Sequence, residues 1–216
     1  MEHDMMTEFV VVRHGETDAN LHGILQGQSD TELNDLGIRQ AQCTAERLKG
    51  EHFDLIYSSD LSRAMKTASA IAAPHGLPVN PLWALREWDL GDLQGHNWEE
   101  LRGRYPEVMA AFKSETEDVP VPGGESRFQF HQRVSDCLDE MSDRFAGKRL
   151  LLVTHGGVLK AMFRHVVGTV SNTSRLPLTS NASVSSFRYE GGFWQLVSWN
   201  DVSHLRNLGE NESVIF

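Results

Sequence analysis

The sequence contains few cysteines and none of the features of a secreted or membrane-bound protein. Cys43 and Cys137 are the only cysteines among its 216 residues, they lie far apart, and no CxxC motif is present. The first residues, MEHDMMTEF, lack the basic segment and apolar stretch of a signal peptide, and no apolar run is long enough to cross a bilayer. These absences exclude a disulfide framework, and they favour a cytoplasmic protein without a membrane partner.

Positively charged residues are also in the minority. The chain has 20 Lys and Arg residues against 30 Asp and Glu residues, a formal net charge of −10 and no run of basic residues. Nucleic acid is therefore not expected as a partner, and any site for an anion must be a local concentration of positive charge within an acidic molecule. The ten histidines include no pair with the spacing of metal ligands on one helix. We predict no metal site and no cofactor.

Apolar residues follow strand-like and helix-like patterns in alternation along the chain. We expect strands at residues 9–12, 53–59, around 79 and 149–155, and helices at residues 34–49, 60–73, 125–145 and 156–168. Asn34 and Asp60 are expected to cap the first two helices. Two β-like runs separated by Glu190-Gly191-Gly192 predict a C-terminal hairpin. This order predicts an α/β fold: a three-layer α/β/α sandwich with a mostly parallel sheet and an antiparallel edge strand. We expect a single domain over residues 1–216, with residues 88–122 as a small helical elaboration.

Charged side chains follow the predicted strands at the points where each strand ends. In open parallel sheets, ligands bind beyond the carboxyl ends of the strands. Two arginines, two histidines and one carboxylate are therefore expected to meet at one edge of the sheet: Arg13, His14, Arg63, Glu87 and His155.

Each of these residue types suits a phosphate group. A guanidinium is always charged, and its planar fork of donors matches two phosphate oxygens. A neutral imidazole is a competent nucleophile, and a carboxyl group can protonate a leaving oxygen and then accept a proton from water. Gly156 lies at the start of a predicted helix, where backbone N–H groups can approach an anion. The residues therefore predict a site for phosphoryl transfer.

The motifs resemble, in order and over nearly the whole chain, those of the histidine phosphatase superfamily, which includes cofactor-dependent phosphoglycerate mutases. They are RHGETDAN, LQGQSDTELNDLGIRQA, SSDLSRAMKTA, LREWDLGDLQG, PGGES, THGG and NDVSHL. The resemblance implies a phosphoglycerate mutase-like fold. Members of the family form monomers, dimers and tetramers, and we expect a monomer or homodimer here. It also implies that His14 is the nucleophile, that Glu87 is the proton donor, and that Arg13, Arg63 and His155 hold the phosphoryl group. A substrate loop is expected to contact the phosphate or its ester through Thr17, Asn20, Gln26 and Gly27.

The segment after Glu87 separates a phosphatase from a mutase. Mutases of this superfamily carry a Tyr and a Lys soon after the catalytic Glu and an Arg-Arg pair in the next insert, whereas this chain has Leu90 and Trp98 and no such pair. We therefore predict a metal-independent phosphomonoesterase that hydrolyses small phosphorylated metabolites through a phosphohistidine. The alternatives are a cofactor-dependent phosphoglycerate mutase and a non-catalytic protein that binds phosphate compounds.

Overall fold

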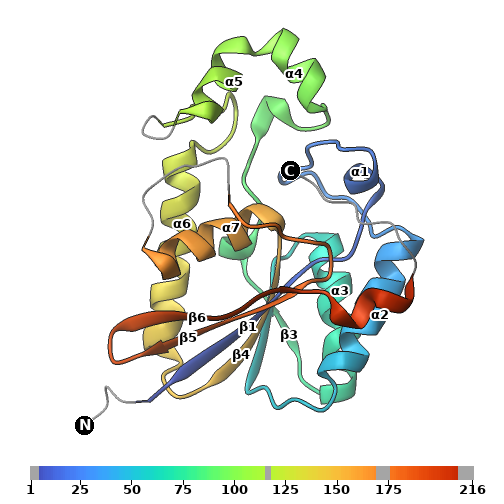
Figure 1. Ribbon diagram of the computed structural model, residues 1–216, viewed down its shortest axis with the longest axis vertical. Helices are drawn as coiled ribbons and strands as arrows, with labels where there is room; N and C mark the ends of the chain where they lie inside the picture. Colours follow the sequence, from blue (N-terminus) through green and yellow to red (C-terminus); the bar gives the residue numbers. More distant parts are fainter. Residues whose placement is uncertain (1–4, 115–117, 169–175, 209–216) are drawn as a thin grey trace.

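A computed structural model of the chain describes residues 5–114, 118–168 and 176–208 (Figure 1). Within these ranges the sheet has six strands in the order β3-β2-β4-β1-β5-β6. The first four in this order are parallel to one another, and β5 and β6 are antiparallel to their neighbours. The predicted mostly parallel sheet with an antiparallel edge is confirmed. The strands are β1 (Thr7–Arg13), β2 (Leu55–Ser58), β3 (Val79–Pro81), β4 (Arg149–Thr154), β5 (Val184–Glu190) and β6 (Phe193–Asp201).

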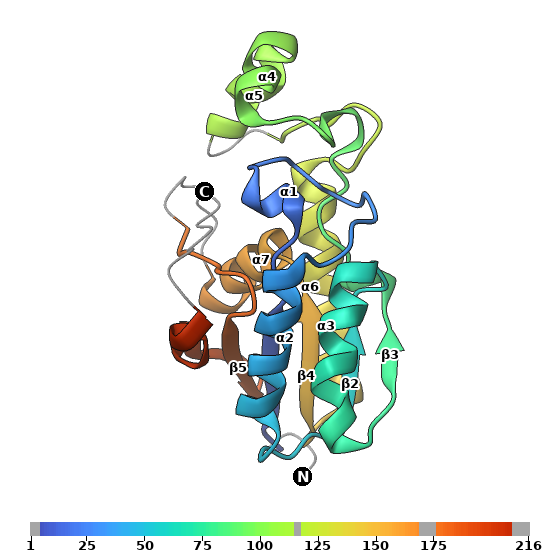
Figure 2. The ribbon, with the colours of Figure 1, turned by 90° about the vertical axis from the view of Figure 1, so that its right-hand side faces the viewer.

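Helices cover both faces of the sheet, as Figures 1 and 2 show together. Helices α2 (Asp35–Leu48) and α3 (Ser62–Ala72) lie on one face, and α6 (Arg127–Arg144) and α7 (Gly156–Val167) lie on the other. Successive residues of β1 point to opposite faces, so Val10 packs in the core on the α2 and α3 side while Val11 packs against α6 and α7. A central strand buried on both faces has to be a continuous apolar run. The three-layer prediction is therefore confirmed.

The N-cap residues of α2 and α3 were both predicted from the local sequence, and only the first prediction is confirmed. Asn34 caps α2 as predicted, since its side chain accepts a hydrogen bond from the backbone N–H of Gly37 at 2.8 Å. The predicted cap of α3 is wrong: the N-cap residue is Leu61, and Asp60 instead forms a bidentate ion pair with Arg86 at 2.6 and 2.7 Å. A guanidinium from a distant segment holds the Asp60 carboxylate, and short-range sequence could not reveal this partner.

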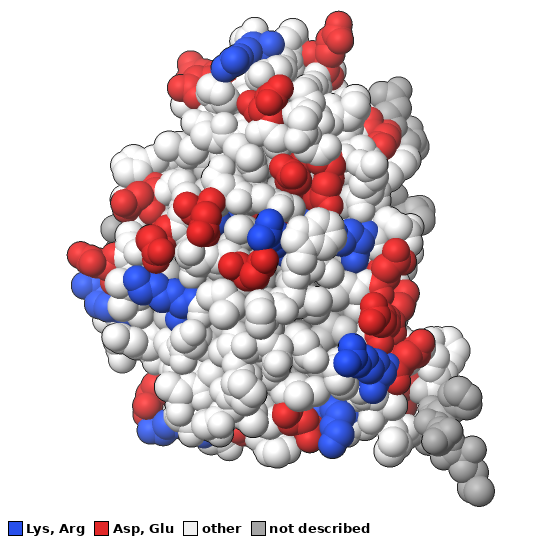
Figure 3. Space-filling view, turned by 180° about the vertical axis from the view of Figure 1, so that it is seen from behind, with Lys and Arg blue, Asp and Glu red and all other residues white. Residues whose placement is uncertain are grey.

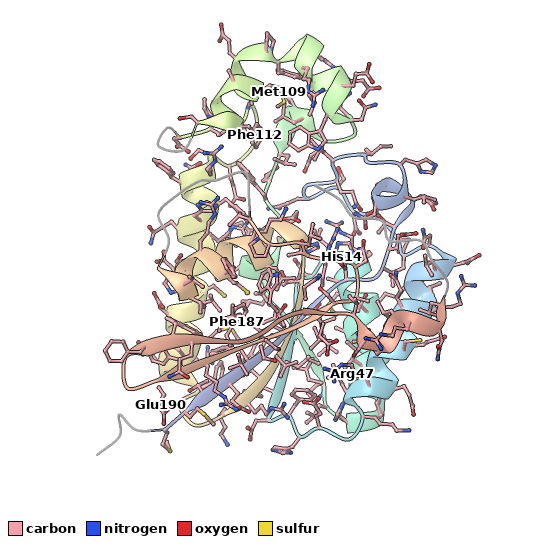
Figure 4. All side chains as sticks on the ribbon, in the orientation of Figure 1. His14, Arg47, Met109, Phe112, Phe187 and Glu190 are labelled. Carbon is pink, nitrogen blue, oxygen red and sulfur yellow. The ribbon has the colours of Figure 1, made fainter. Side chains whose placement is uncertain are left out.

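A small helical layer stands beyond the carboxyl ends of the strands (Figure 1). It contains α4 (Trp98–Arg104) and α5 (Pro106–Lys113), and its own apolar core includes Leu90 and Met109. Trp88 joins this core to α6 by stacking on Phe130, with ring centroids 5.3 Å apart. Figure 4 shows Met109 and Phe112 within this layer and His14 nearer the sheet. Both helices lie within residues 88–122, for which a small helical elaboration is predicted, and residues 115–117 lie outside the described residues.

The remaining helices are short. They are α1 (Asp18–Leu21) and the 3₁₀ helices η1 (Ala73–His75), η2 (Trp83–Leu85), η3 (Gly91–Leu93) and η4 (Ser203–Leu208). In the ranges that the structure describes, no helix combines the length and apolar character that crossing a membrane requires. On the face shown in Figure 3, Lys and Arg side chains are interspersed with Asp and Glu side chains rather than gathered in one basic surface.

A partly buried histidine on α6 makes the fold sensitive to acid. The pKa of His131 is lowered to about 4, first by burial and then by the charges of Arg164 and Arg127, while Asp118 opposes them. In the unfolded chain the pKa returns to the ordinary 6.5, so between pH 6.5 and 4 the unfolded state binds a proton that the folded state does not. Stability is therefore lost as the pH falls through this window.

Between pH 7.5 and 5.5, the free energy of unfolding should fall by about 1 kcal/mol less in a His131→Gln variant than in the wild type. The reason is that the variant has no imidazole to protonate on unfolding. Urea unfolding at the two pH values measures both losses. Equal losses in the two proteins would contradict the prediction.

Candidate active site

The pairing of β1 with β4 brings the two predicted site histidines together. Arg13 and Thr154 are partners in the parallel register, so the next residue on each strand, His14 and His155, lies just beyond the sheet. The backbone N–H of His14 still donates to the carbonyl oxygen of Thr154 at 2.9 Å. The two imidazole rings lie 5.0 Å apart, centroid to centroid, and both residues are buried.

The surroundings of His14 fix the tautomer of its ring and keep the ring neutral. The Nδ1 atom lies 2.7 Å from the carbonyl oxygen of Gly15, which can only accept, so Nδ1 carries the proton and Nε2 carries the free electron pair. Burial lowers the pKa of His14 well below 6.5, and the positive charges of Arg63 and Arg13 lower it further. The ring is therefore neutral at physiological pH, which is the state in which it can attack phosphorus.

Two buried arginines flank this histidine. Arg13 ends β1, and its Nη1 atom donates to the carbonyl oxygen of Thr179. Arg63 lies in the first turn of α3, and its two Nη atoms donate to the carbonyl oxygens of Gly27 and Ser29, both at 2.8 Å. Burial lowers the pKa of each arginine to about 10, so both keep their charge at neutral pH.

Three buried donors at the site have no hydrogen-bond partner among the residues that the structure describes. They are the Nε atoms of Arg13 and Arg63 and the Nδ1 atom of His155. On the other side of the His155 ring, Nε2 lies 2.8 Å from the hydroxyl oxygen of Ser59, which also accepts from the N–H of Leu61. Among the described residues the Ser59 hydroxyl has no acceptor other than Nε2, so its proton is directed there and the ring proton resides on Nδ1. Since buried polar groups are nearly always paired, this cluster is built to receive an acceptor-rich anion.

Glu87 is held beside the start of α7. Its Oε2 atom accepts from the N–H of Gly157 at 3.0 Å, and its Oε1 atom accepts from the N–H of Trp88 at 2.9 Å. A Cβ atom on Gly157 would lie 2.2 Å from Oε1, so only glycine allows this approach. Glu87 also acts electrostatically on both Arg13 and Arg63. The carboxylate therefore belongs to the same charged cluster as the two arginines.

The predicted substrate loop is rigid and presents donors. Asn20 uses its Oδ1 atom to accept from the N–H of Thr17 and from Nδ2 of Asn181. Gln26 likewise uses its Oε1 atom to accept from the hydroxyls of Thr17 and Thr31. The acceptor ends of both amides are thus occupied within the loop, and the NH₂ ends remain for an anion. The Thr17 hydroxyl also accepts from the N–H of Asn20 and caps α1.

Two predicted glycines act through their backbones. Gly27 has φ of +50°, and its carbonyl oxygen accepts from Arg63. Gly156 opens α7, and a Cβ atom there would lie 3.3 Å from Nε of Arg13. Its lack of a side chain keeps the helix N-terminus open towards the arginine. Among the described residues, no three His, Cys, Asp or Glu side chains group in a way that would hold a metal ion.

Sequence reasoning missed three residues that support the site. Ser59 positions His155, and its place directly after β2 was a signal that could have found it. Asn181 is buried and donates to the carbonyl oxygen of His14 at 3.1 Å, but nothing in its sequence surroundings indicates this role. Arg133 donates to the carbonyl oxygen of Glu87 at 3.2 Å and pairs with Glu125 at 2.7 Å. Arg133 lies on α6, and the helical pattern there suggests that its side chain is exposed to solvent. The sequence therefore gives no sign of its contact with Glu87.

Known proteins resemble this chain in both sequence and structure. Residues 9–202 match the histidine phosphatase superfamily (branch 1). The chain is 42% identical over 206 residues, 94% of this chain and 88% of the relative, to phosphoglycerate mutase-like protein 4 of Arabidopsis thaliana. It is 41% identical over 207 residues, 94% of this chain and 85% of the relative, to the metal-independent phosphoserine phosphatase of the same plant. A mutant phosphoserine phosphatase of Entamoeba histolytica, solved in complex with phosphoserine, has a TM-score of 0.84 and 30% identity, with coverage of 92% of this chain and 99% of that chain.

These similarities confirm the predicted resemblance, the phosphoglycerate mutase-like fold and the prediction of a phosphatase. The roles of the individual site residues, as distinct from their positions, stay predictions. By sequence over most of its length, this chain belongs to the histidine phosphatase superfamily.

Proposed function

We propose that the protein hydrolyses phosphate monoesters of small metabolites through a phosphohistidine formed on His14. One observation carries the proposal: Arg13, Arg63 and His155 each have a buried nitrogen without a partner among the described residues, and all three neighbour a histidine whose Nε2 atom has a free electron pair. A phosphoryl group supplies acceptors for the three donors and an electrophile for the nucleophile.

In the first step, Nε2 of His14 attacks phosphorus in line with the leaving oxygen. A P–N bond forms and the P–O ester bond breaks, while the Gly15 carbonyl stabilises the positive charge that grows on the ring through the Nδ1–H bond at 2.7 Å. Arg13 and Arg63 stabilise the negative charge on the equatorial oxygens. Glu87 enters this step as the carboxylic acid, donates its proton to the departing alkoxide and is left as the carboxylate.

In the second step, water attacks the phosphohistidine. Glu87 takes a proton from the water, the P–N bond breaks, and inorganic phosphate leaves with Nε2 of His14 regaining its electron pair. The two backbone N–H groups that hold the Glu87 carboxylate keep it in one place for both proton transfers. The carbonyl of the same residue accepts from Gln28 and Arg133 at 3.1 and 3.2 Å, which fixes its backbone as well.

The helical layer above the site supports hydrolysis rather than mutase chemistry. A mutase has to hold a second phosphate while the bisphosphate reorients, which requires further cations. Here Leu90 is buried in the apolar core of that layer, and Trp98 packs against the same core. These two positions therefore offer no positive charge to a second phosphate, and water is the expected acceptor of the phosphoryl group.

Phosphoserine is the substrate that we propose to test first. One similar protein is named a phosphoserine phosphatase, and another was solved in complex with phosphoserine. We expect the purified protein to release phosphate from phosphoserine in the presence of a chelator. We also expect no 2-phosphoglycerate from 3-phosphoglycerate when an enolase-coupled assay is primed with a trace of bisphosphoglycerate. Detection of free phosphate measures the first result.

Efficient mutase turnover would contradict the proposal in favour of a phosphoglycerate mutase. Binding without turnover on a panel of phosphorylated metabolites and p-nitrophenyl phosphate would indicate a non-catalytic binding protein. A cytoplasmic location and a monomeric or homodimeric state stay predictions, which fractionation and light scattering can test.

A further inference from the structure

A cation that the proposed reaction does not use lies beside the site on α7. Lys160 is one turn beyond Gly156, and residues four apart share a face of a helix. Side chains on a helix lean towards its N-terminus, and the N-terminal turn of α7 contacts Glu87 through Gly157 and approaches Arg13 at Gly156.

The electrostatics agree with this placement. Burial lowers the pKa of Lys160, the charges of Arg13 and Arg164 lower it further, and the charge of Glu87 raises it. The charges of two residues of the phosphate site, Arg13 and Glu87, are therefore felt at this lysine. Across the described ranges, its Nζ atom forms no hydrogen bond or ion pair. A partly buried ammonium without a partner is unfavourable, and an anion beside it would relieve that cost.

Two other cations near this end of the site, both on α6, are already engaged. Arg127 donates to the carbonyl oxygens of Ala111, Phe112 and Ser114, and Arg133 pairs with Glu125. Lys160 therefore offers one positive charge, which matches a carboxylate better than a second phosphate dianion. Its position near Glu87 places it on the side where the leaving group departs.

We propose that Lys160 binds a carboxylate of the leaving group, so that the site selects phosphate monoesters of small carboxylic acids. The inference rests on the proposed function, because the phosphoryl group has to occupy the cluster of Arg13, Arg63 and His155 for the leaving group to reach Lys160. The ester oxygen then lies near Glu87, and the carboxylate forms a charge-assisted hydrogen bond with Nζ.

The test compares two esters that differ only in the carboxylate, phosphoserine and phosphoethanolamine. We expect Lys160→Met to lower kcat/KM for phosphoserine roughly 10- to 100-fold, as expected for a lost charged hydrogen bond, and to leave phosphoethanolamine within about threefold. Lys160→Arg should retain most of the preference. Lys49→Met is the matched control, because Lys49 is exposed and lies at the far end of α2 from the site.

Two further measurements make the result specific. Competitive inhibition by inorganic phosphate should be unchanged in Lys160→Met, because phosphate has no carboxylate to lose. The same selective loss is expected for 3-phosphoglycerate relative to glycerol 3-phosphate. Equal losses on both members of each pair would overturn the inference and assign Lys160 to the phosphate itself, and no loss on either would show that Lys160 does not contact the substrate.

Results with the wild-type protein distinguish a failure of the proposed function from a failure of the inference about Lys160. A wild-type protein that releases no phosphate from any ester, p-nitrophenyl phosphate included, would overturn the proposed function and this inference together. A wild-type protein that hydrolyses p-nitrophenyl phosphate but shows no preference for the carboxylate member of either pair would overturn the inference alone.

Discussion

A His14→Ala variant is expected to lose phosphatase activity by on the order of 10⁴-fold or more, the scale on which removal of a nucleophile acts. The physical reason is that Nε2 of His14 is the only atom of the site assigned to bond with phosphorus, whereas Arg13, Arg63 and His155 only stabilise charge. Phosphate release from p-nitrophenyl phosphate measures the loss. Retention of the wild-type rate would show that the nucleophile lies elsewhere.

His155→Ala is the matched control for this result, because it removes a neighbouring buried imidazole but leaves the nucleophile. Acid-quenched reactions with ³²P-labelled ester should trap a phosphoenzyme in the wild type and, at reduced yield, in His155→Ala. No label should remain on His14→Ala. Since both histidines are buried, urea unfolding of each variant is needed to show that it is folded under the assay conditions.

A Glu87→Ala variant is expected to lose activity selectively, according to the leaving group. Phosphoserine has an alkoxide leaving group that requires a proton, so phosphoenzyme formation from it should slow by roughly 10²- to 10⁴-fold. The nitrophenolate of p-nitrophenyl phosphate leaves without protonation, so its first turnover should remain fast. Rapid mixing should then show a burst of one nitrophenolate per site, followed by slow turnover, because water attack still lacks its base.

This comparison does not depend on the folded fraction, because both esters are measured on the same preparation. Alanine is preferred to glutamine, because the amide nitrogen of a glutamine side chain here would face one of the two backbone N–H groups that hold the Glu87 carboxylate now. An equal slowing of the first turnover with both esters would contradict the assignment of Glu87 as the proton donor.

Much of the fold could be predicted, because the elements that carry it have strong local patterns. The continuous apolar run that becomes β1 is buried on both faces, which requires a central strand. Asn34 at the start of α2 is a strong capping residue, and its side chain does accept the expected backbone hydrogen bond. The predicted strands also located the strand ends, and this placed Arg13, His14 and His155 at one edge of the sheet.

Other features had no local signal. Asp60 has the right residue type and position for a helix cap, yet it pairs with Arg86 from a later segment. Arg133 follows a helical pattern that suggests exposure, yet it donates to the backbone carbonyl of Glu87. Lys160 is an ordinary helix residue in the sequence, and only the approach of α7 to Glu87 and Arg13 gives it a role. In each case the partner is distant along the chain.

The sequence by itself determined the succession of strands and helices and the residue types that follow each strand, because apolar periodicity and strand-end position are local properties. Only the tertiary structure decided which nitrogen of His14 is free, which donors of Arg13, Arg63 and His155 lack partners, and which further cation feels the charge of Glu87. The direction of a buried donor depends on every acceptor around it. Those acceptors come from segments that meet only when the sheet and its helices have packed.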